Sequence, residues 1–383
     1  MTDPARRNIS IALPSTGEEE WLALRESIES GWLSQGPKVA AFEKAFAARH
    51  QVGHALATTS CTTALHLALA ASGIGPGDEV IVPAFTWVAT ANVVIYCGAT
   101  PVFVDVDPIT YNMDMAHLAG AITPCTKAVI PVHLFGLCAD MPALRDVVPD
   151  GVVIIEDAAC AAGATLDGQP AGGLGTMACF SFHPRKSITT GEGGMLTTDD
   201  SDLAEAANRL RNHGASVSEE VRHHGPKPYL LPDFDVLGFN YRMSDLQGAL
   251  GLVQLGKLDR FIAERDKWAR WYCDALADIA WLQMPVIPAG YGHAWQSFVT
   301  VVDEASAPAL RNDIMETLQE AGISTRPGTH AVTELGYYKD RLGLQSGQFK
   351  VASRLERQTL ALPLHNRMSA EDYTYVSETL HGI

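Results

Sequence analysis

Between residues 54 and 156, short runs of apolar residues alternate with segments that have helical periodicity. The apolar runs cover residues 54–58, 79–83, 101–106, 128–132 and 152–156. Helical patterns fill much of the intervals, at residues 62–71, 88–97, 114–121 and 141–147. Strands that alternate with helices predict βαβ units and a mostly parallel α/β sheet buried on both faces. Functional loops are then expected at the carboxyl ends of the strands.

The flanking segments extend this pattern. Further helices are expected at residues 18–30, 39–49, 201–210, 244–277 and 308–321, and from Ser369 onward. Pro308 would occupy the favoured first position of its helix. An extended run is expected at 296–302, and the polar segment 214–237 is expected to be a loop that is either functional or disordered. A length of 383 residues favours two domains, which we place at 1–255 and 256–383, with the second smaller and of α+β type.

Charge and cysteine content restrict the class of protein. The formal net charge of −16 argues against a nucleic-acid or membrane partner. The first 20 residues have no apolar segment of the kind found in signal peptides. The seven cysteines are scattered and form no CxxC pair, so we expect reduced thiols, no metal site and a cytoplasmic protein.

One lysine stands in an irregular turn between two apolar runs. The runs are 177–182 and 195–198, and the turn contains Lys186 among hydroxyl groups and glycines. Rigid scaffolds carry reactive side chains on such connections. If Lys186 is a reactive amine, the chain should also supply an anion-binding turn, an acidic partner and a flat aromatic surface.

Each of these three features is present, and each has an ordinary structural alternative. Residues 59–65 are small and open a helix, which suits a phosphate, although Ser60 also fits a simple helix N-cap. Asp157 ends a buried strand, where it would either pair with a cation or cap the next helix. Phe85 and Trp87 follow another strand, where they would either stack on a planar ligand or pack in the core.

Together the amine, carboxylate, phosphate-binding turn and aromatic surface are the groups that pyridoxal 5′-phosphate (PLP) needs. Six motifs make the resemblance to one family specific: SCTTAL (60–65), GDEVIVPAFTWVATANVV (77–94), PVHLFG (131–136), EDAA (156–159), FSFHPRKSITTGEGG (180–194) and GFNYRMSDLQGALGLVQL (238–255). In this order they resemble the DegT/DnrJ/EryC1/StrS family of sugar aminotransferases. The resemblance implies the PLP-dependent fold type I, which is that of aspartate aminotransferase.

The resemblance also implies roles for individual residues. Lys186 matches the lysine that forms a Schiff base with the cofactor and moves a proton during the reaction. Burial and a neighbouring cationic cofactor are expected to lower the pKa of its amine. Asp157 matches the carboxylate that pairs with the pyridine nitrogen. The remaining cofactor contacts are Cys61, Thr62 and Ser181 at the phosphate, Trp87 on the ring, and Asn240 reaching the phosphate from the other subunit of a homodimer with shared active sites.

Two positions depart from the family pattern. The glutamine and histidine that commonly follow the EDAA motif are Cys160 and Ala162 here. We expect Cys160 to line the cofactor pocket without a catalytic role, since a thiol is a poor hydrogen-bonding substitute for an amide. Near the C-terminus, residues 325–330 replace a Tyr-x-Pro-x-His sequence and keep only the histidine, His330. Both changes affect the expected substrate more than the cofactor chemistry.

Three further residues are candidates for substrate contacts. His183 is close to Lys186 in sequence, and His330 aligns with the family histidine. Arg242 would bind an anionic group of the amino donor or a nucleotide phosphate, or form a salt bridge at the subunit interface.

The expected activity is transfer of an amino group from L-glutamate to a keto-sugar, linked to a nucleotide, in amino-sugar biosynthesis. A keto-cyclitol or another keto-sugar is an alternative acceptor. A non-catalytic binding or regulatory protein with the same fold is an alternative from another class. A related group of dehydratases has histidine in place of the lysine, and Lys186 argues against that activity.

Overall fold

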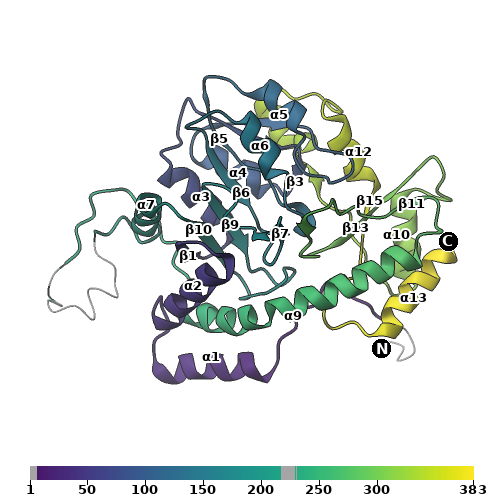
Figure 1. Ribbon diagram of the computed structural model, residues 1–383, viewed down its shortest axis with the longest axis horizontal. Helices are drawn as coiled ribbons and strands as arrows, with labels where there is room; N and C mark the ends of the chain where they lie inside the picture. Colours follow the sequence, from purple (N-terminus) through teal and green to yellow (C-terminus); the bar gives the residue numbers. More distant parts are fainter. Residues whose placement is uncertain (1–6, 217–228, 230) are drawn as a thin grey trace.

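A seven-stranded sheet forms the centre of the molecule (Figure 1). The structure, a computed structural model, describes residues 7–216, 229 and 231–383. The strands of this sheet are β1 (His54–Thr58), β2 (Glu79–Pro83), β4 (Thr100–Val104), β5 (Thr126–Val129), β6 (Val153–Asp157), β9 (Met177–Ser181) and β10 (Gly194–Thr198). Their order is β1-β10-β9-β6-β5-β2-β4. Pairings are parallel from β9 to β4, whereas β10 is antiparallel to both β9 and β1. The expected α/β fold with a mostly parallel sheet is confirmed.

Strand β9 shows why the apolar runs are continuous. Met177 and Cys179 pack in one hydrophobic cluster, and Ala178 and Phe180 pack in another. Adjacent side chains of a strand point to opposite faces, so a sheet covered on both sides needs apolar residues at every position.

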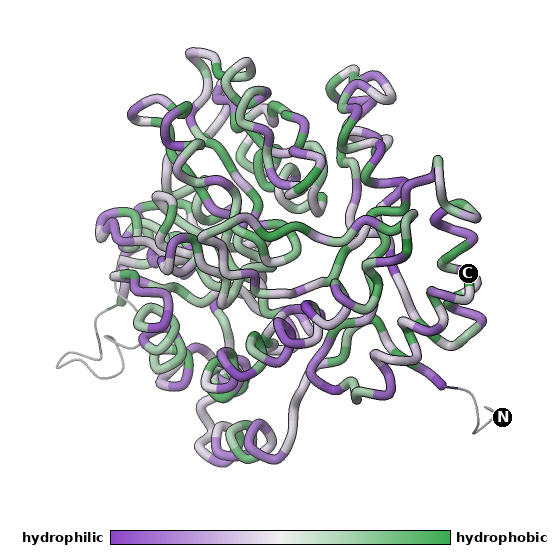
Figure 2. The backbone as a smooth tube through the Cα atoms, turned by 45° about the vertical axis from the view of Figure 1, so that its right-hand side comes forward, coloured by the Kyte–Doolittle hydropathy of each residue, from purple (hydrophilic) through white to green (hydrophobic). Residues whose placement is uncertain are grey.

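Helices cover both faces of the sheet. They are α2 (Pro37–His50), α3 (Cys61–Ala71), α4 (Ala89–Tyr96), α5 (Met115–Ala121), α6 (Met141–Val147) and α7 (Ser201–Arg211). Helix α1 (Glu18–Ser30) packs on the outside against α9 (Asp245–Ala275). Along such surface helices the chain alternates between hydrophilic and hydrophobic residues (Figure 2). Among the described residues, every helix is too short or too polar to cross a membrane.

Helix α9 runs from the sheet to the C-terminal part of the chain (Figure 1). It begins at a capping box in which Ser244 accepts a hydrogen bond from the backbone N–H of Gln247. Gly248 and Gly251 let α2 approach closely: a Cβ at Gly248 would lie 2.7 Å from the backbone nitrogen of Val39. The helix continues without a break past residue 255, so the expected domain boundary at that point stays a prediction.

The C-terminal part contains a second, smaller sheet. Its strands are β11 (Leu282–Gln283), β13 (Phe298–Val302) and β15 (Thr359–Leu362), and α10 (Arg311–Glu320) and α13 (Ala370–His381) accompany them. Tyr272, Trp295 and Phe298 pack here with Tyr373, and Ile9 from the N-terminal arm joins the same cluster. The expected position of Pro308 at the start of a helix is wrong. Helix α10 begins at Arg311 after the N-cap Leu310, and Pro308 lies in the preceding turn.

Several short elements complete the fold. They are β3 (Phe85–Thr86), β7 (Thr165–Leu166), β8 (Gln169–Pro170), β12 (Tyr291–Gly292), β14 (His330–Ala331), the 3₁₀ helices Leu134–Gly136 and Val332–Glu334, and the helices α11 (Gly336–Leu342) and α12 (Lys350–Gln358). Strand β14 pairs with β3, with His330 opposite Thr86. This pairing holds residues 326–330 beside the central sheet. Most of the expected polar loop 214–237 lies outside the described residues.

Candidate active site

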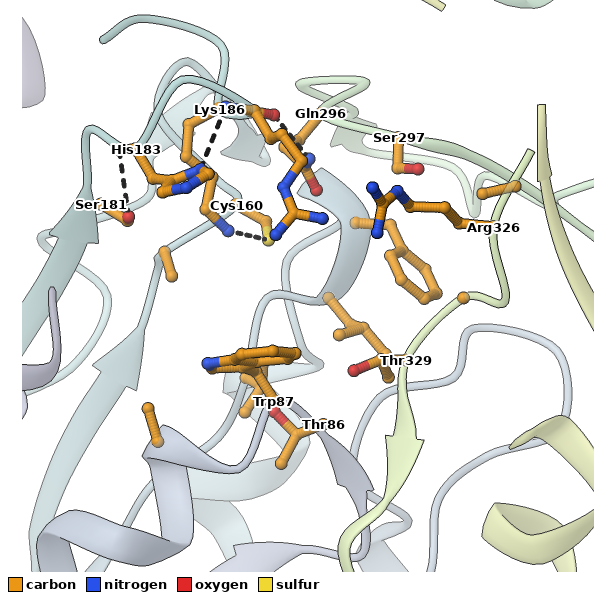
Figure 3. Close-up of a pocket in the computed structure, with 18 of the residues that line it drawn as sticks. Thr86, Trp87, Cys160, Ser181, His183, Lys186, Gln296, Ser297, Arg326 and Thr329 are labelled. Carbon is orange, nitrogen blue, oxygen red and sulfur yellow. Dashed lines mark hydrogen bonds between the residues drawn. The ribbon is translucent and has the colours of Figure 1, made fainter. Parts of the chain in front are cut away.

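Lys186 lies in a turn that the backbone holds in place. The turn joins β9 to β10, and its ends are linked by a hydrogen bond from the Phe182 N–H to the Gly193 carbonyl at 2.9 Å. The Lys186 N–H donates to the His183 carbonyl at 2.8 Å. The side-chain amine of Lys186 donates to the sulfur of Cys160 at 3.1 Å (Figure 3). The sequence-based prediction of a lysine at the edge of the sheet is therefore confirmed.

The amine faces a cavity of about 700 Å³. One side of this cavity, which we call the sheet wall, is formed by the segments 157–160 and 181–186, from which these residues line it: Asp157, Ala159, Cys160, Ser181, His183, Arg185 and Lys186. The opposite side, the C-terminal wall, consists of residues 296–297 and 326–330. Gln296 joins the two walls, because its side-chain amide donates to the carbonyl of Arg185 at 2.9 Å.

Asp157 is a buried carboxylate on the sheet wall. It ends β6 and is 5% exposed. The Thr90 hydroxyl donates to its Oδ2 at 2.7 Å, and the Ala159 N–H donates to its Oδ1 at 3.2 Å. Burial raises the pKa of Asp157, although these two hydrogen bonds and the nearby Lys186 act in the opposite direction. Such a carboxylate favours a cationic ligand, because a cation would offset the cost of its desolvation.

The N-terminus of α3 opens into the same cavity. Ser60 is the N-cap and accepts a hydrogen bond from the Thr63 N–H at 3.1 Å, so the alternative role of Ser60 as a helix N-cap is confirmed. The first N–H groups of a helix have no partner inside the helix and favour an anion. Gly194 permits this arrangement, since a Cβ there would lie 2.3 Å from the carbonyl carbon of Ser60. The hydroxyls of Thr62 and Ser181 also line the cavity and add hydrogen-bond donors for an anion.

Of the two aromatic candidates, only Trp87 faces the cavity. Phe85 is fully buried in the core. Trp87 is 57% exposed, and its ring lies across the cavity from Lys186 and Cys160 (Figure 3). Its ring centroid is 5.6 Å from that of His330. The position of Trp87 suits a planar ligand held between the ring and the sheet wall.

The expected lowering of the Lys186 pKa included the bound cofactor and stays a prediction, but the protein's own groups shift this pKa in the opposite direction. Burial lowers the pKa of this amine, but the neighbouring sulfur of Cys160 and the carboxylate of Asp157 outweigh burial and raise it. The first of these groups, Cys160, accepts a hydrogen bond from the amine at 3.1 Å. The sequence-based expectation considered burial and a cationic neighbour, and it did not consider the sulfur at 3.1 Å.

The structure brings together most of the other predicted site residues. Cys61, Thr62, Trp87, Cys160, Ser181, His183 and His330 line the cavity with Lys186 and Asp157. Asn240 and Arg242 do not line it within this chain. Arg242 donates to the Asn212 side-chain oxygen at 2.6 Å, and Asn240 forms a backbone bridge with the same residue. Their predicted role depends on a second subunit and stays a prediction.

Two residues of the site escaped the sequence analysis. Thr90, inside α4, carried no signal, because a lone threonine in a helix predicts no contact with a strand 67 positions later. Arg326 lies in the segment 325–330, but only its histidine had been considered. The Arg326 side chain points into the cavity from the C-terminal wall (Figure 3). Among the described residues, its guanidinium has no hydrogen-bond or ion-pair partner.

These residues fit PLP. The fit rests on the buried carboxylate of Asp157, whose desolvation a cationic ring nitrogen would offset, on the N-terminus of α3, and on the lysine amine at the same cavity. The residues that would hold the group are Asp157 at the ring nitrogen, Thr62 and Ser181 at the phosphate, and Trp87 on the ring.

Comparisons with known proteins agree with this geometry. Residues 14–381 match the model of the DegT/DnrJ/EryC1/StrS aminotransferase family. The chain is 42% identical to the spore coat polysaccharide biosynthesis protein SpsC of Bacillus subtilis, over 100% of this chain and 99% of that protein. It is 40% identical to GDP-perosamine synthase of Caulobacter vibrioides, over the full length of both. The structure of Spr1654 from Streptococcus pneumoniae in its PLP form has 30% identity and a TM-score of 0.89, with 97% of each chain covered.

The comparisons confirm the expected fold type, the cofactor PLP, and the activity of a sugar aminotransferase in amino-sugar biosynthesis. This chain belongs to the DegT/DnrJ/EryC1/StrS aminotransferase family.

Proposed function

We propose that this enzyme transfers the amino group of L-glutamate to a nucleotide-linked keto-sugar, as a homodimer in the cytoplasm. The observation that carries the proposal is the convergence of Lys186, Asp157 and the N-terminus of α3 on one cavity, which also contains Arg326, a side chain with no partner among the described residues. The first three groups serve the cofactor, and the arginine is left for an anionic substrate.

The residues of the sheet wall have separate tasks. The bound cofactor supplies an electron sink for negative charge that develops on the substrate carbon next to nitrogen. Asp157 holds a positive charge at the ring nitrogen, which keeps that sink effective. Lys186 moves a proton to and from the substrate carbon, since its amine is in the cavity and can change protonation state there. Ser181, together with Thr62 at the N-terminus of α3, would hold the phosphate and so fix the position of the ring.

Arg326 is proposed to bind an anionic group of a substrate. A guanidinium without a protein partner is well suited to a carboxylate or a phosphate, which it binds through two parallel hydrogen bonds. Its backbone is fixed by pairing with β15, where the Ala361 N–H donates to the Arg326 carbonyl at 2.7 Å. His183 and His330 lie on opposite walls of the same cavity and are proposed to contact the sugar.

The relatives support the class of acceptor. GDP-perosamine synthase carries a nucleotide-linked sugar in its name, and SpsC is named for polysaccharide biosynthesis. An acceptor with a diphosphate would place negative charge near the cationic residues of the site. A subunit partner would bring its Asn240 and Arg242 within reach of the phosphate groups.

The cytoplasmic location is supported by the cysteines. All seven are free thiols in the structure. Free thiols persist in reducing compartments, whereas secreted proteins form disulfides from them.

Replacement of Lys186 tests the proposal. The Lys186→Ala variant should lose multiple turnover, measured as 2-oxoglutarate released from L-glutamate in the presence of a panel of nucleotide-linked keto-sugars. The loss should be about a thousandfold or more, because the proton carrier is removed. Lys186→Arg keeps the positive charge and should be equally inactive, which separates proton transfer from simple electrostatics.

Each alternative has its own outcome. Multiple turnover by Lys186→Ala would contradict the proposed role of the lysine. If the enzyme aminates a keto-cyclitol and none of the nucleotide-linked keto-sugars, the acceptor is a keto-cyclitol. A wild-type protein that takes up PLP but transfers no amino group would favour a binding protein.

A further inference from the structure

Cys160 occupies an unusual place in this site. It follows β6 by three residues, lines the cavity, and its sulfur is 3.1 Å from the Lys186 amine. Figure 3 shows the two side chains meeting across the cavity from Trp87, and both line that cavity. A thiol in hydrogen-bond contact with a lysine, and open to small molecules, is the environment in which reactive cysteines are found.

We propose that Cys160 and Lys186 form a site of reversible oxidative cross-linking, in which a hydroperoxide oxidises the sulfur and the lysine amine captures it in an S–N bond. The proposal concerns these two side chains and adds a modification to the site, beyond the transfer reaction.

The chemistry balances in two steps. The Cys160 thiol gives up its proton as its sulfur attacks one oxygen of hydrogen peroxide; the O–O bond breaks, the proton goes to the departing hydroxide, and a sulfenic acid and one water result. The free-base amine of Lys186 then attacks this sulfur, the S–O bond breaks, and a second water leaves as the S–N bond forms. A sulfenic acid is known to condense with nitrogen in this manner. In total the pair loses two hydrogen atoms, sulfur is oxidised by two electrons, and one peroxide becomes two waters.

Thiol reductants reverse the bond. A reductant thiolate attacks the linked sulfur, the amine leaves with a proton, and a mixed disulfide forms on Cys160. A second reductant thiol then frees Cys160. The lysine is therefore recovered unchanged.

The electrostatics of the pair favour capture after oxidation. Among the groups that raise the pKa of Lys186, Cys160 is first. Oxidation of Cys160 alters this contact, while the burial that lowers the lysine pKa persists. The Lys186 amine should therefore lose its proton more readily once the sulfur is oxidised.

Neighbouring cysteines are poor competitors. Burial raises the pKa of both Cys61 and Cys179 well above the usual range, so they stay protonated. The Cys61 thiol also donates to the Cys179 carbonyl at 3.4 Å. Cys160 is half-buried at the cavity whereas Cys61 and Cys179 are buried, so Cys160 is the sulfur in this cluster that a peroxide reaches first.

The cross-link competes with the cofactor for one nitrogen. This part rests on the proposed function, in which Lys186 is bonded to the cofactor at rest and is released when L-glutamate has donated its amino group. The enzyme should therefore resist peroxide when loaded with PLP, and become sensitive when L-glutamate is present without an acceptor. Protein freed of cofactor should be sensitive regardless of the proposed function.

Intact-protein mass spectrometry provides the test. The full-length protein is treated with stoichiometric hydrogen peroxide in three forms: free of cofactor, loaded with PLP, and loaded with PLP plus L-glutamate. The first and third should lose two hydrogen atoms, and dithiothreitol should restore the mass. Tryptic mapping should show that cleavage after Lys186 is blocked and that its peptide is joined to residues 146–185, which contain Cys160.

Matched variants identify the two atoms. Cys160→Ser should abolish the linked peptide, and Cys125→Ser, at an exposed cysteine, should retain it. Lys186→Arg should gain oxygen on Cys160 without losing two hydrogens. A two-hydrogen loss that persists in Lys186→Arg would indicate a disulfide and overturn the proposal, as would oxygen addition to Cys160 with Lys186 still cleavable in the cofactor-free wild type. If only the L-glutamate form fails to respond, the proposed function fails and the cross-link stands.

Discussion

The two walls of the cavity differ in how their polar side chains are satisfied. On the sheet wall, Asp157 accepts a hydrogen bond from Thr90, and Lys186 donates one to Cys160. On the C-terminal wall, Arg326 has a fixed backbone and, within the described part of the chain, a guanidinium without a partner. The protein therefore orients the sheet-wall groups that would bind the cofactor before the cofactor arrives. The Arg326 guanidinium on the C-terminal wall stays available to the substrates, which are exchanged in each cycle. Preorganised groups reduce the reorganisation that catalysis requires.

Asp157→Asn should produce the largest effect. The amide has nearly the same shape but no charge, so it loses the ion pair with the cofactor ring nitrogen. Removal of one partner of a buried ion pair costs about 3–5 kcal/mol. We expect kcat to fall by about a hundredfold or more, as each 1.36 kcal/mol is a factor of ten. Steady-state transamination at saturating PLP measures this. Asp146→Asn, at an exposed residue of α6, should behave as wild type.

Thr90→Val tests whether the sheet wall is held by its own hydrogen bonds. Valine keeps the branched shape and removes the hydroxyl that donates to Asp157 at 2.7 Å. A buried acceptor that loses its donor costs about 1–3 kcal/mol, which predicts a loss of cofactor affinity of about tenfold. Equilibrium titration with PLP measures it. Thr90→Ser restores the donor and should restore affinity. Equal affinities of the serine and valine variants would mean that packing alone orients Asp157.

Arg326→Gln should affect the opposite wall alone. Loss of a charge-assisted hydrogen bond predicts that KM for one anionic substrate rises by about tenfold. PLP affinity should be unchanged. A rise in KM for L-glutamate assigns the guanidinium to the amino donor, and a rise for the nucleotide-linked sugar assigns it to the acceptor. Arg341→Gln, on the exposed side of α11, is the matched control. A loss of PLP affinity in the Arg326→Gln variant would contradict the assignment of the cofactor to the sheet wall and of the substrates to the C-terminal wall.

The sheet wall was largely predictable, for physical reasons. Its strands are buried on both faces, and this produces apolar runs that can be located in the sequence. The reactive positions follow those runs directly, so Asp157 and Lys186 were found from local sequence. Thr90 was not, since its contact with Asp157 joins α4 to β6 through tertiary packing.

The C-terminal wall was less predictable, because long-range pairing places it. Residues 326–330 reach the cavity through the two-residue pairing of β14 with β3, which leaves no periodic signal. Pro308 shows a related failure: the residue suits a helix start, but it equally suits the turn in which it lies. The segment's histidine was identified by resemblance, whereas the orientation of Arg326 needed the structure.

The smallest expected effect concerns the rate at which PLP attaches to Lys186 at different pH values. This rate tests how the neighbouring side chains of the sheet wall control the lysine amine. Lys186 must lose its proton before it bonds to added PLP, and its pKa is raised. Below that pKa the fraction of free amine grows about tenfold per pH unit, so the attachment rate should rise between pH 7 and pH 9.

Cys160→Ala removes the group that raises this pKa most, and leaves the burial that lowers it. The pKa of Lys186 should fall in the variant, and attachment at a given pH should be faster by a few-fold to about tenfold. The rise in visible absorbance after PLP is added to cofactor-free protein measures the rate. Cys125→Ala should retain the wild-type profile. Identical profiles for Cys160→Ala and wild type would mean that the sulfur does not control the pKa of Lys186, and that Asp157 holds its proton instead.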